Sequence, residues 1–563
     1  MAGAGPVPPT PPDDPATDLL RARAALLAPA PGGRRLAPAA LRAALVDLHD
    51  LWLATRATAA GVERGSALVA IGSLGRRELA PYSVPDLLLV HDGTLPGPHG
   101  IHGVAAALGT PLRAVCTVGE AVEASLVDLP TALDLLDARL VAGDAELVDR
   151  LVGTARRAWR AGAATRAVDL VEATHARWRR AGDVAHRVEP DLVAGRGGLR
   201  DLTLLDALAT AGAADRVPPE VRAARGVLLD LRTDLHRHAG RARDVLRVED
   251  LPDLAAPHDL LRALGGAGRA VAATTGSALR ALRPPSRDTA PGPPPADLGL
   301  GVVVHAGEVT LARRASVARD PVLVLRLAAA AARTGRPMAP SALRRLADAA
   351  PELRAPWPDA ARTALLALLG AGDGLVEVVE ALDRAGLWGR LLPEWGAVRD
   401  LPPGRPRHVW TVGRHLLEVT RRAAALADRV ARPDLLLLTA LVHGLGQGRD
   451  EDPAVVGATL AGQVGRRLGL AADDVGVLTA AVRHQDLLLR TAHRGDPEEP
   501  GTVRRVLAAL DGDPLLLELL HALAEAEARG TGPGVWTPWR ARLLGDLVAR
   551  CRPAVRGGAV TRR

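Results

Sequence analysis

Apolar residues recur at helical spacing along most of the chain, and this pattern restricts the fold more than any other feature. The pattern covers about residues 18–53 and 119–282, and most of the chain after residue 312. The spacing changes at only two places: residues 67–90 hold two continuous apolar runs around a glycine turn, and residues 301–311 have the signature of a hairpin. We therefore predict a predominantly helical α+β fold with a small α/β part near the N-terminus.

Proline-rich breaks and changes of pattern divide the chain into parts. Six of the twelve residues from Pro284 to Pro295 are proline, which is typical of a linker. The predicted parts are a disordered proline-rich tail (1–17), an α/β domain (18–150), a helical domain (151–283), a linker (284–297), a hairpin with a helical linker domain (298–400), an all-α domain (401–552) and a tail (553–563).

The composition excludes several classes of function. All 71 basic side chains are arginine, so no lysine can form a Schiff base or serve a Walker-type phosphate loop. The arginines are interspersed with 64 acidic residues and aromatic residues make up 2%, so we predict no nucleic-acid partner. The two cysteines lie far apart and no apolar run is long enough for a membrane span, so we predict a cytoplasmic protein without a membrane partner.

The first candidate site is the glycine turn between the two predicted strands. Gly72, Ser73 and Gly75 form this turn, where backbone N–H groups and a hydroxyl can bind a triphosphate. Asp86 opens the next strand, from which a carboxylate can hold Mg²⁺ against those phosphates. The turn alone is weak evidence, because many such strings are ordinary tight turns.

The longer string that contains this turn, GSLGRRELAPYSVPDL, resembles the nucleotidyltransferase signature of the PII uridylyltransferase/uridylyl-removing family, G-S-x-G-R-x-E-L-x-P-x-S-D-x-D-L. The resemblance implies an enzyme that uridylylates or adenylylates the PII nitrogen-regulatory protein, with UTP or ATP as donor and Mg²⁺ or Mn²⁺ as cofactor. It also implies nucleotide contacts by Gly72, Ser73, Gly75 and Arg76, and metal binding and catalysis by Asp86.

The sequence departs from the family pattern at the metal ligands. Val84 stands where the family carries the first Asp of its Asp-x-Asp pair. No acidic residue occurs from Gly93 to Gly119, although enzymes of this type use a third carboxylate on a later strand. One carboxylate cannot clamp two divalent cations, so we expect a degenerate transferase metal site.

A second string, EPDLVAGRGGLRDL from Glu189 to Leu202, is nearly identical to a connector of the same family. Two interpretations stay open at this stage. The glycines permit a close turn before a helix that Asp201 helps to cap, which is a structural role. Alternatively, Arg196 or Arg200 contacts the phosphates of the nucleotide.

The second candidate site is a set of histidines on successive helical segments. A lone helical histidine is usually a surface or core residue, but the surroundings of His415, His443 and His484 resemble the HD-type phosphohydrolase domain of this family. The resemblance implies a metal held by these three and Glu527, with His443 catalytic. The defining His-Asp doublet is His443-Gly444 here, so this metal site is also expected to be degenerate.

Further departures lie around these histidines. Later family histidines fall at Pro453 and Gln485, while Asp450 and Asp452 are near enough in sequence to be substitute ligands. The chain ends at Arg563, so we expect the family's C-terminal ACT domains to be absent. Three hypotheses remain: a bifunctional enzyme, an inactive homologue that binds PII or a nucleotide as a regulator, and a phosphohydrolase alone.

Overall fold

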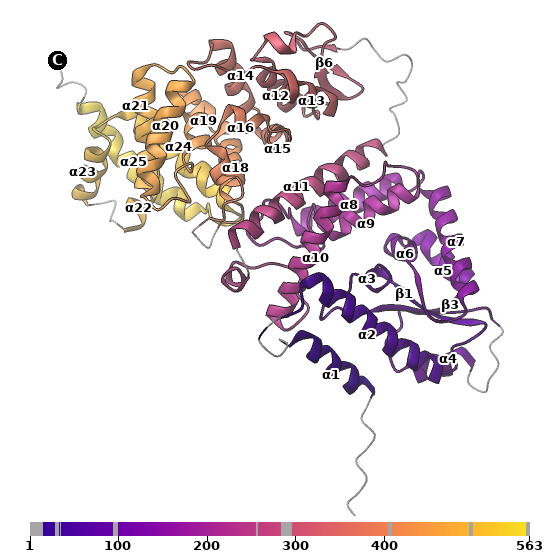
Figure 1. Ribbon diagram of the computed structural model, residues 1–563. Helices are drawn as coiled ribbons and strands as arrows, with labels where there is room; N and C mark the ends of the chain where they lie inside the picture. Colours follow the sequence, from indigo (N-terminus) through magenta and orange to yellow (C-terminus); the bar gives the residue numbers. More distant parts are fainter. Residues whose placement is uncertain are drawn as a thin grey trace, which may run out of the picture. The chain divides into compact units, whose positions relative to one another are not determined.

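The computed structural model in Figure 1 describes residues 15–28, 33, 35–93, 100–254, 257–282, 296–403, 408–494 and 499–558. The chain divides into two compact units. The first comprises Met1–Ala185 and Glu189–Pro284, and the second comprises His186–Val188 and Pro285–Arg563. Within the described ranges, no helix combines the length and the hydropathy that crossing a membrane requires.

The first unit contains one sheet and its covering helices. Its strands are β1 (Ser66–Ile71), β2 (Asp86–His91), β3 (Ala114–Thr117) and β4 (Arg139–Gly143). Its helices are α1 (Pro15–Leu27), α2 (Pro38–Ala59), α3 (Gly72–Gly75), α4 (Gly100–Leu108), α5 (Val118–Val127), α6 (Leu129–Leu135), α7 (Ala145–Gly162), α8 (Ala167–Ala181), α9 (Leu199–Thr210), α10 (Pro219–Ala239) and α11 (Pro257–Ala281).

The sheet has the strand order β3-β2-β1-β4. Strand β1 is antiparallel to β2 and to β4, and β2 is parallel to β3. Side chains alternate across the sheet: Val69 and Leu88 join a core with α5 and α7, whereas Leu68 and Leu89 join a core with α2 and α4. Both central strands are therefore buried on both faces, which explains their continuous apolar runs.

Three predictions for the first unit are corrected. Strand β4 lies inside the stretch predicted to be helical, because the sheet pairing with β1 overrides the local pattern. The predicted boundary between residues 150 and 151 falls within α7, whose Leu147 and Leu151 belong to the core of the sheet. Residues 15–17, predicted to belong to a disordered tail, begin helix α1.

The second unit is mostly helical. Its strands are β5 (Ala296–Asp297), β6 (Val302–His305) and β7 (Glu308–Leu311). Its helices are α12 (Leu323–Thr334), α13 (Pro340–Ala349), α14 (Asp359–Leu369), α15 (Leu375–Arg384), α16 (Leu387–Leu391), α17 (Trp395–Val398), α18 (Val412–Ala424), α19 (Pro433–Val442), α20 (Pro453–Arg467), α21 (Ala472–Arg483), α22 (Leu487–Arg494), α23 (Pro500–Ala509), α24 (Pro514–Thr531) and α25 (Pro538–Gly558).

The predicted hairpin is present as β6 and β7, and the structure extends it. Strand β5 pairs with β6, which makes a sheet of three strands, although the predicted linker includes residues 296–297. Two residues are too few to give a periodic signal. The remaining linker residues, 284–295, lie outside the described residues. Helix α25 continues to Gly558, into the stretch predicted to be a tail.

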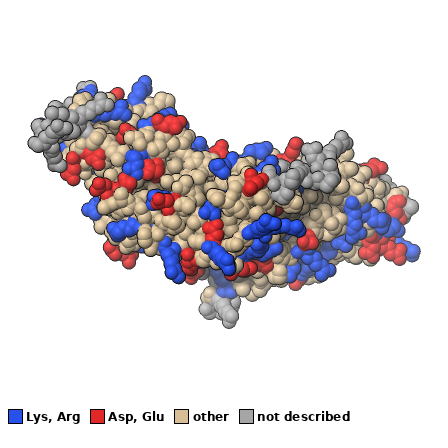
Figure 2. All heavy atoms as spheres, turned by 90° about the horizontal axis from the view of Figure 1, so that it is seen from above, with Lys and Arg blue, Asp and Glu red and all other residues tan. Residues whose placement is uncertain are grey.

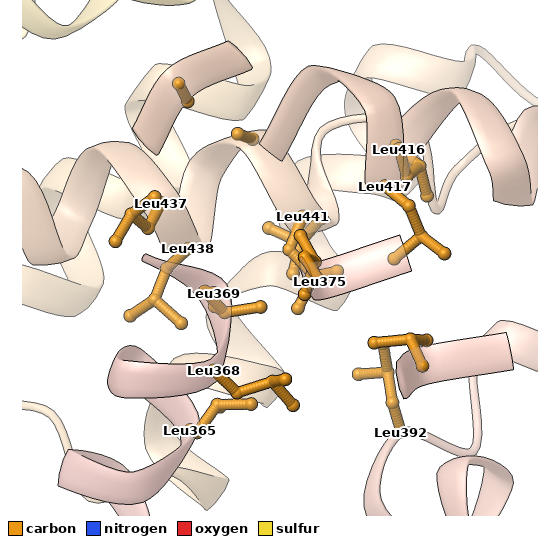
Figure 3. Packing of buried hydrophobic residues seen from close by; sticks show 14 of the residues in the cluster. Leu365, Leu368, Leu369, Leu375, Leu392, Leu416, Leu417, Leu437, Leu438 and Leu441 are labelled. Atoms are coloured by element: carbon orange, nitrogen blue, oxygen red, sulfur yellow. The ribbon is translucent and has the colours of Figure 1, made fainter. Parts of the chain in front are cut away.

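Leucine packing joins the helices that carry the candidate histidines. One continuous core of the second unit runs through α12, α14, α18, α19 and α24, across the predicted boundary between residues 400 and 401. Figure 3 shows leucines that contribute to this core from α14, α15, α18 and α19: Leu365, Leu368, Leu369, Leu375, Leu416, Leu417, Leu437, Leu438 and Leu441. Each fully buried leucine contributes roughly 2 kcal/mol of hydrophobic free energy, so this core fixes the helix positions.

Glycine permits an especially close approach of α24 to α18. A Cβ on Gly530 would lie 2.8 Å from Val419 Cγ2 and 3.1 Å from Val419 N. Gly413, near the start of α18, is packed in a similar way, since its Cβ would lie 2.9 Å from Arg399 Cα. Larger side chains would separate these elements.

Charge on the visible face is mixed. Figure 2 shows arginine side chains and acidic side chains interspersed, with apolar and neutral surface between them. This distribution matches the near balance of 71 basic and 64 acidic residues.

The connector string folds around a buried carboxylate. The Asp201 side chain is 0% exposed, pairs with Arg177 at 2.5 Å, and accepts hydrogen bonds from Gly197 N at 2.7 Å and Trp178 Nε1 at 3.0 Å. Gly197 has φ +88°, and a Cβ there would lie 2.3 Å from the Gly268 carbonyl oxygen. The string therefore joins α8, α9 and α11 through contacts that tolerate no other residue at Gly197.

We predict that Asp201→Ala destabilises the protein by about 3 kcal/mol, because it leaves the Arg177 guanidinium buried without its counter-charge. Chemical denaturation measures this change. Asp169→Ala, an exposed acid on α8, is the matched control and should change stability by less than about 0.5 kcal/mol. Equal stability of the two variants would contradict the structural role of Asp201.

Candidate functional site

The glycine turn of the first unit is helix α3, which follows β1 directly. Gly72 has φ +58°, in the left-handed region that favours glycine. A Cβ on Gly75 would lie 2.5 Å from the Asp137 carbonyl oxygen and 3.1 Å from that of Ala70. The close packing around Gly75 is therefore sufficient to explain why this position is a glycine.

Two carboxylates lie together over this turn. A Cβ on Gly72 would lie 3.1 Å from Asp86 Oδ2 and 3.5 Å from Asp134 Oδ1. Burial, followed by the charge of Asp134, raises the pKa of the Asp86 carboxyl. Asp134 comes from α6, and sequence reasoning missed it because only the packing of α3 on α6 brings it here.

A positively charged side chain, that of Arg113, also lies at this edge of the sheet. Arg113 directly precedes β3 and donates to Asp134 Oδ2 at 2.6 Å and to Thr131 Oγ1 at 3.0 Å. Its own backbone N–H donates to the Leu87 carbonyl oxygen at 2.8 Å, which holds it beside β2. The stretch from Gly93 to Gly119, which has no acidic residue, thus supplies an arginine to this edge of the sheet. Val84, at the position of the first motif aspartate, is 72% exposed.

The charged residues at the centre of the string form a network of ion pairs. Arg76 contacts Glu78 Oε2 at 2.9 Å and Asp137 Oδ2 at 3.4 Å, and Arg225 from α10 contacts Glu78 Oε1 at 2.7 Å. Burial opposes ionisation of Glu78, but the two arginines lower its pKa below the usual range. The Arg76 guanidinium therefore has protein partners, and its predicted contact with the nucleotide stays a prediction.

The end of the string is attached to α10 and the segment after it. Tyr82 N donates to His236 Nδ1 at 3.3 Å, and Arg232 Nη2 donates to Ser83 Oγ at 3.3 Å. Asp244 accepts from Arg232 Nε at 2.7 Å and lies 3.4 Å from His236 Nε2. Burial opposes the charge of Asp244, but the His236 hydrogen bond and Arg232 lower its pKa to about 2.

The two connector arginines lie in different surroundings. Arg196 stacks over Trp178 at 5.2 Å from the ring centroid and lies 3.9 Å from Asp183 Oδ1. Arg200 is exposed near the start of α9. The structural interpretation of this string rests on the contacts of Asp201 and Gly197 described above, and phosphate binding by either arginine stays a prediction.

The second unit contains a cluster of three residues with metal-ligand chemistry. His415 comes from α18, His443 follows the last residue of α19, and Glu527 comes from α24. One ligand atom of each lies within 4.8 Å of the other two. Both imidazoles are buried, and their ring centroids are 5.6 Å apart. This arrangement can hold a divalent metal.

Backbone groups orient both imidazoles. His443 Nδ1 donates to the Ala440 carbonyl oxygen at 2.8 Å, and a hydrogen bond joins His415 to the main chain of Gly530. His443 Nε2 and His415 Nδ1 are buried with no hydrogen-bond partner among the described residues. Burial lowers the pKa of His443 to about 4, and burial together with His443 lowers that of His415 well below its usual value. Both rings are therefore neutral near pH 7, with lone pairs available for a metal.

The structure does not bring the other predicted ligands into this cluster. His484 follows α21 and is partly exposed, and Asp450 is exposed. Asp452 caps α20, where its Oδ1 accepts from Ala454 N at 2.9 Å. Position 444, where the His-Asp doublet has its acid, is closely packed: a Cβ on Gly444 would lie 3.0 Å from Leu416 Cδ2.

His408 is a neighbour that sequence reasoning missed. Its ring centroid lies 4.7 Å from that of His415, and it precedes α18. The string HVWTVGRH, which places His408 and His415 on either side of the helix start, was the available signal.

Comparisons with known proteins match both units. The HD domain family model matches residues 412–519. A bifunctional uridylyltransferase/uridylyl-removing enzyme of Mycobacterium tuberculosis is 47% identical over 96% of this chain, and those of Streptomyces coelicolor and Corynebacterium glutamicum are 42% and 37% identical over 92% and 87%. The matches span 70%, 65% and 72% of these three proteins.

We predict a pH-dependent contribution of Asp244 to stability. Its folded-state pKa is depressed, so the contribution is present above the unfolded value of 3.8 and is lost as pH falls towards 2. Allowing for solvent screening of this partly exposed group, Asp244→Asn should cost roughly 1 kcal/mol near neutral pH.

Thermal unfolding of wild type and Asp244→Asn between pH 3 and pH 7 measures this effect. The difference in Tm should be about 2 °C at neutral pH and should shrink as the pH approaches 3. Asp215→Asn, an exposed acid of the same unit, is the control. A difference independent of pH would contradict the prediction.

Proposed function

The chain belongs to the bifunctional uridylyltransferase/uridylyl-removing enzyme family, and from this premise we propose that it attaches a nucleotide to a PII signalling protein and removes it again. The identity of 47% over 96% of the chain covers both the sheet-containing unit and the helical unit. The single structural observation that carries the proposal is the cluster of the buried His415 and His443, which lie within the part of the chain that the HD domain matches, with the half-buried Glu527.

The removal activity is assigned to this cluster. The two imidazoles are neutral and oriented by main-chain hydrogen bonds, so they present nitrogen lone pairs at neutral pH. Glu527 adds one anionic oxygen donor. A bound divalent ion would supply the Lewis acidity and the activated water that phosphodiester hydrolysis requires.

The transfer activity is assigned to the turn of the first unit. Gly72 and Ser73 of the α3 turn are the proposed contacts for the phosphates of UTP, the proposed donor, with ATP as the alternative. Asp86 is the proposed ligand for Mg²⁺ or Mn²⁺, and Asp134 is the neighbouring carboxylate that supports it in place of an acid at position 84. Arg113 beside Asp134 supplies a positive charge for the triphosphate.

We predict that purified protein with Mg²⁺ and α-labelled UTP transfers label to the PII protein. Asp86→Asn should lower the transfer rate by about 100-fold or more, because it removes an anionic metal ligand. Glu123→Gln, an exposed acid on α5, is the matched control and should transfer at the wild-type rate. Parallel reactions with labelled ATP identify the donor. Absence of label with either nucleotide would exclude transfer and leave the hydrolase alone.

We also predict release of the nucleotide from modified PII by this protein. His443→Ala should lower release by about 100-fold or more while transfer continues, because the hydrolase site loses a ligand. The control is His305→Ala, an exposed histidine of the β6–β7 hairpin. If neither transfer nor release occurs while PII still binds, the chain is an inactive regulator.

A further inference from the structure

The segment that leads from the glycine turn to Asp86 is held by a buried histidine of α10. Tyr82 N donates to His236 Nδ1 at 3.3 Å, and the His236 side chain is 0% exposed. A main-chain N–H can only donate, so Nδ1 is the acceptor and the ring carries its proton on Nε2. That second nitrogen lies 3.4 Å from Asp244 Oδ1. The imidazole therefore connects a carboxylate to the main chain of the string.

A second residue of α10 holds the same segment. Arg232 stands four residues before His236, so both side chains lie on one face of the helix. Arg232 Nε donates to Asp244 Oδ1 at 2.7 Å, and its Nη2 donates to Ser83 Oγ at 3.3 Å. Asp244 thus orients both side chains, and these contact two successive residues of the string, Tyr82 and Ser83.

We propose that His236 is a positioning residue of the transferase site, which holds the segment before Asp86 so that this carboxylate faces the glycine turn. The proposal rests on the proposed transfer activity and extends it to a residue of α10. Pairing with Ile71 fixes the main chain of Asp86 on the side of β1. The residues before Asp86 precede the strand, and the contacts with α10 hold them.

The chain from Tyr82 to Asp86 is too short to absorb a displacement. Three residues separate the two, and Pro85, the last of them, has its φ fixed near about −65°. A shift of the Tyr82 main chain is therefore transmitted to the start of β2. Asp86 Oδ2 lies close to the turn there, 3.1 Å from where a Cβ on Gly72 would be. A misplacement of about 1 Å at a reacting site can cost roughly 100-fold in rate.

The connector string holds the carboxylate that orients this histidine. Residues 190–192 of the connector pair antiparallel with residues 244–246. Leu192 N donates to the Asp244 carbonyl oxygen at 2.9 Å, so the connector fixes the main chain of that acid. A line of hydrogen bonds thus runs from the connector through Asp244 and His236 to the string. The connector supports the transferase site in this way without any contact to the nucleotide.

Two substitutions at position 236 separate the contacts of the ring. Asparagine places an amide oxygen near the position of Nδ1, so His236→Asn keeps an acceptor for Tyr82 N. Glutamine places its amide near the position of Nε2, so His236→Gln keeps a donor for Asp244 and leaves Tyr82 N unpartnered. A buried N–H without a partner is costly, and a shift of the segment relieves that cost. His238→Gln, at an exposed histidine on another face of α10, is the matched control.

Calorimetry of UTP binding to the full chain at increasing Mg²⁺ tests the position of Asp86 without measuring transfer. His236→Gln should raise the Mg²⁺ concentration for half-maximal binding by at least about 5-fold, whereas His236→Asn and His238→Gln should stay within about 2-fold of wild type. In the transfer assay, His236→Gln should lower kcat by about 10-fold or more and leave KM for PII unchanged. Thermal unfolding gives the Tm of each variant.

Asp244→Asn provides a second test if His236→Gln does not fold. It removes the carboxylate that orients the ring, and we expect it to lose little in Tm. It should raise the same Mg²⁺ requirement by at least about 3-fold.

Two results would overturn the proposal. One is a wild-type Mg²⁺ requirement in His236→Gln or, in its place, in Asp244→Asn. The other is an equal loss in His236→Gln and His236→Asn that follows their loss of Tm, which would indicate a structural role alone. Wild type that binds UTP with Mg²⁺ as expected but transfers no label would contradict only the proposed function. Wild type that binds no UTP would contradict both.

Discussion

The close packing of α18 against α19 and α24 is the contact on which the candidate metal centre depends. His415, His443 and Glu527 come from three helices, and their ligand atoms converge only if the helix axes are held at short distance. Leucines from α18 and α19 provide the apolar contact, and Gly530 lets α24 approach α18 without a side chain between them. The same burial keeps both imidazoles neutral, so the core sets the chemistry as well as the geometry.

Charged residues of the first unit play a different part. Glu78 and Asp201 are the acids of two conspicuous strings, and both are held by arginines within the protein. These buried pairs align the glycine turn with α10 and the connector with α8. Several charges of these two strings therefore organise the fold, while the metal-binding role proposed for Asp86 concerns one residue of the first string.

Much of the architecture could be predicted from periodicity. The continuous apolar runs of β1 and β2 and the hairpin β6–β7 are confirmed, as is the predominance of helix, and the histidine segments lie where an HD domain matches. Strand β4 was missed because a short strand inside an amphipathic region has no distinct period, and β5 because two residues carry no pattern. Asp134 was missed because it belongs to no motif and reaches its site through tertiary packing. His408 was missed although it shares a short string with His415, because the string does not show that the two rings come into contact.

The sequence by itself determined the family and the helical class. It also showed which aspartates the metal motifs lack, since Val84 and Gly444 stand at the positions where the family pattern has Asp. Only the tertiary structure decided which of the remaining groups meet. It brought Glu527 to His415 and His443, left His484 outside, and placed Asp134 beside Asp86. The physical reason is that ligand geometry depends on distances of a few ångströms between separate helices, and those distances follow from side-chain packing rather than from spacing along the chain.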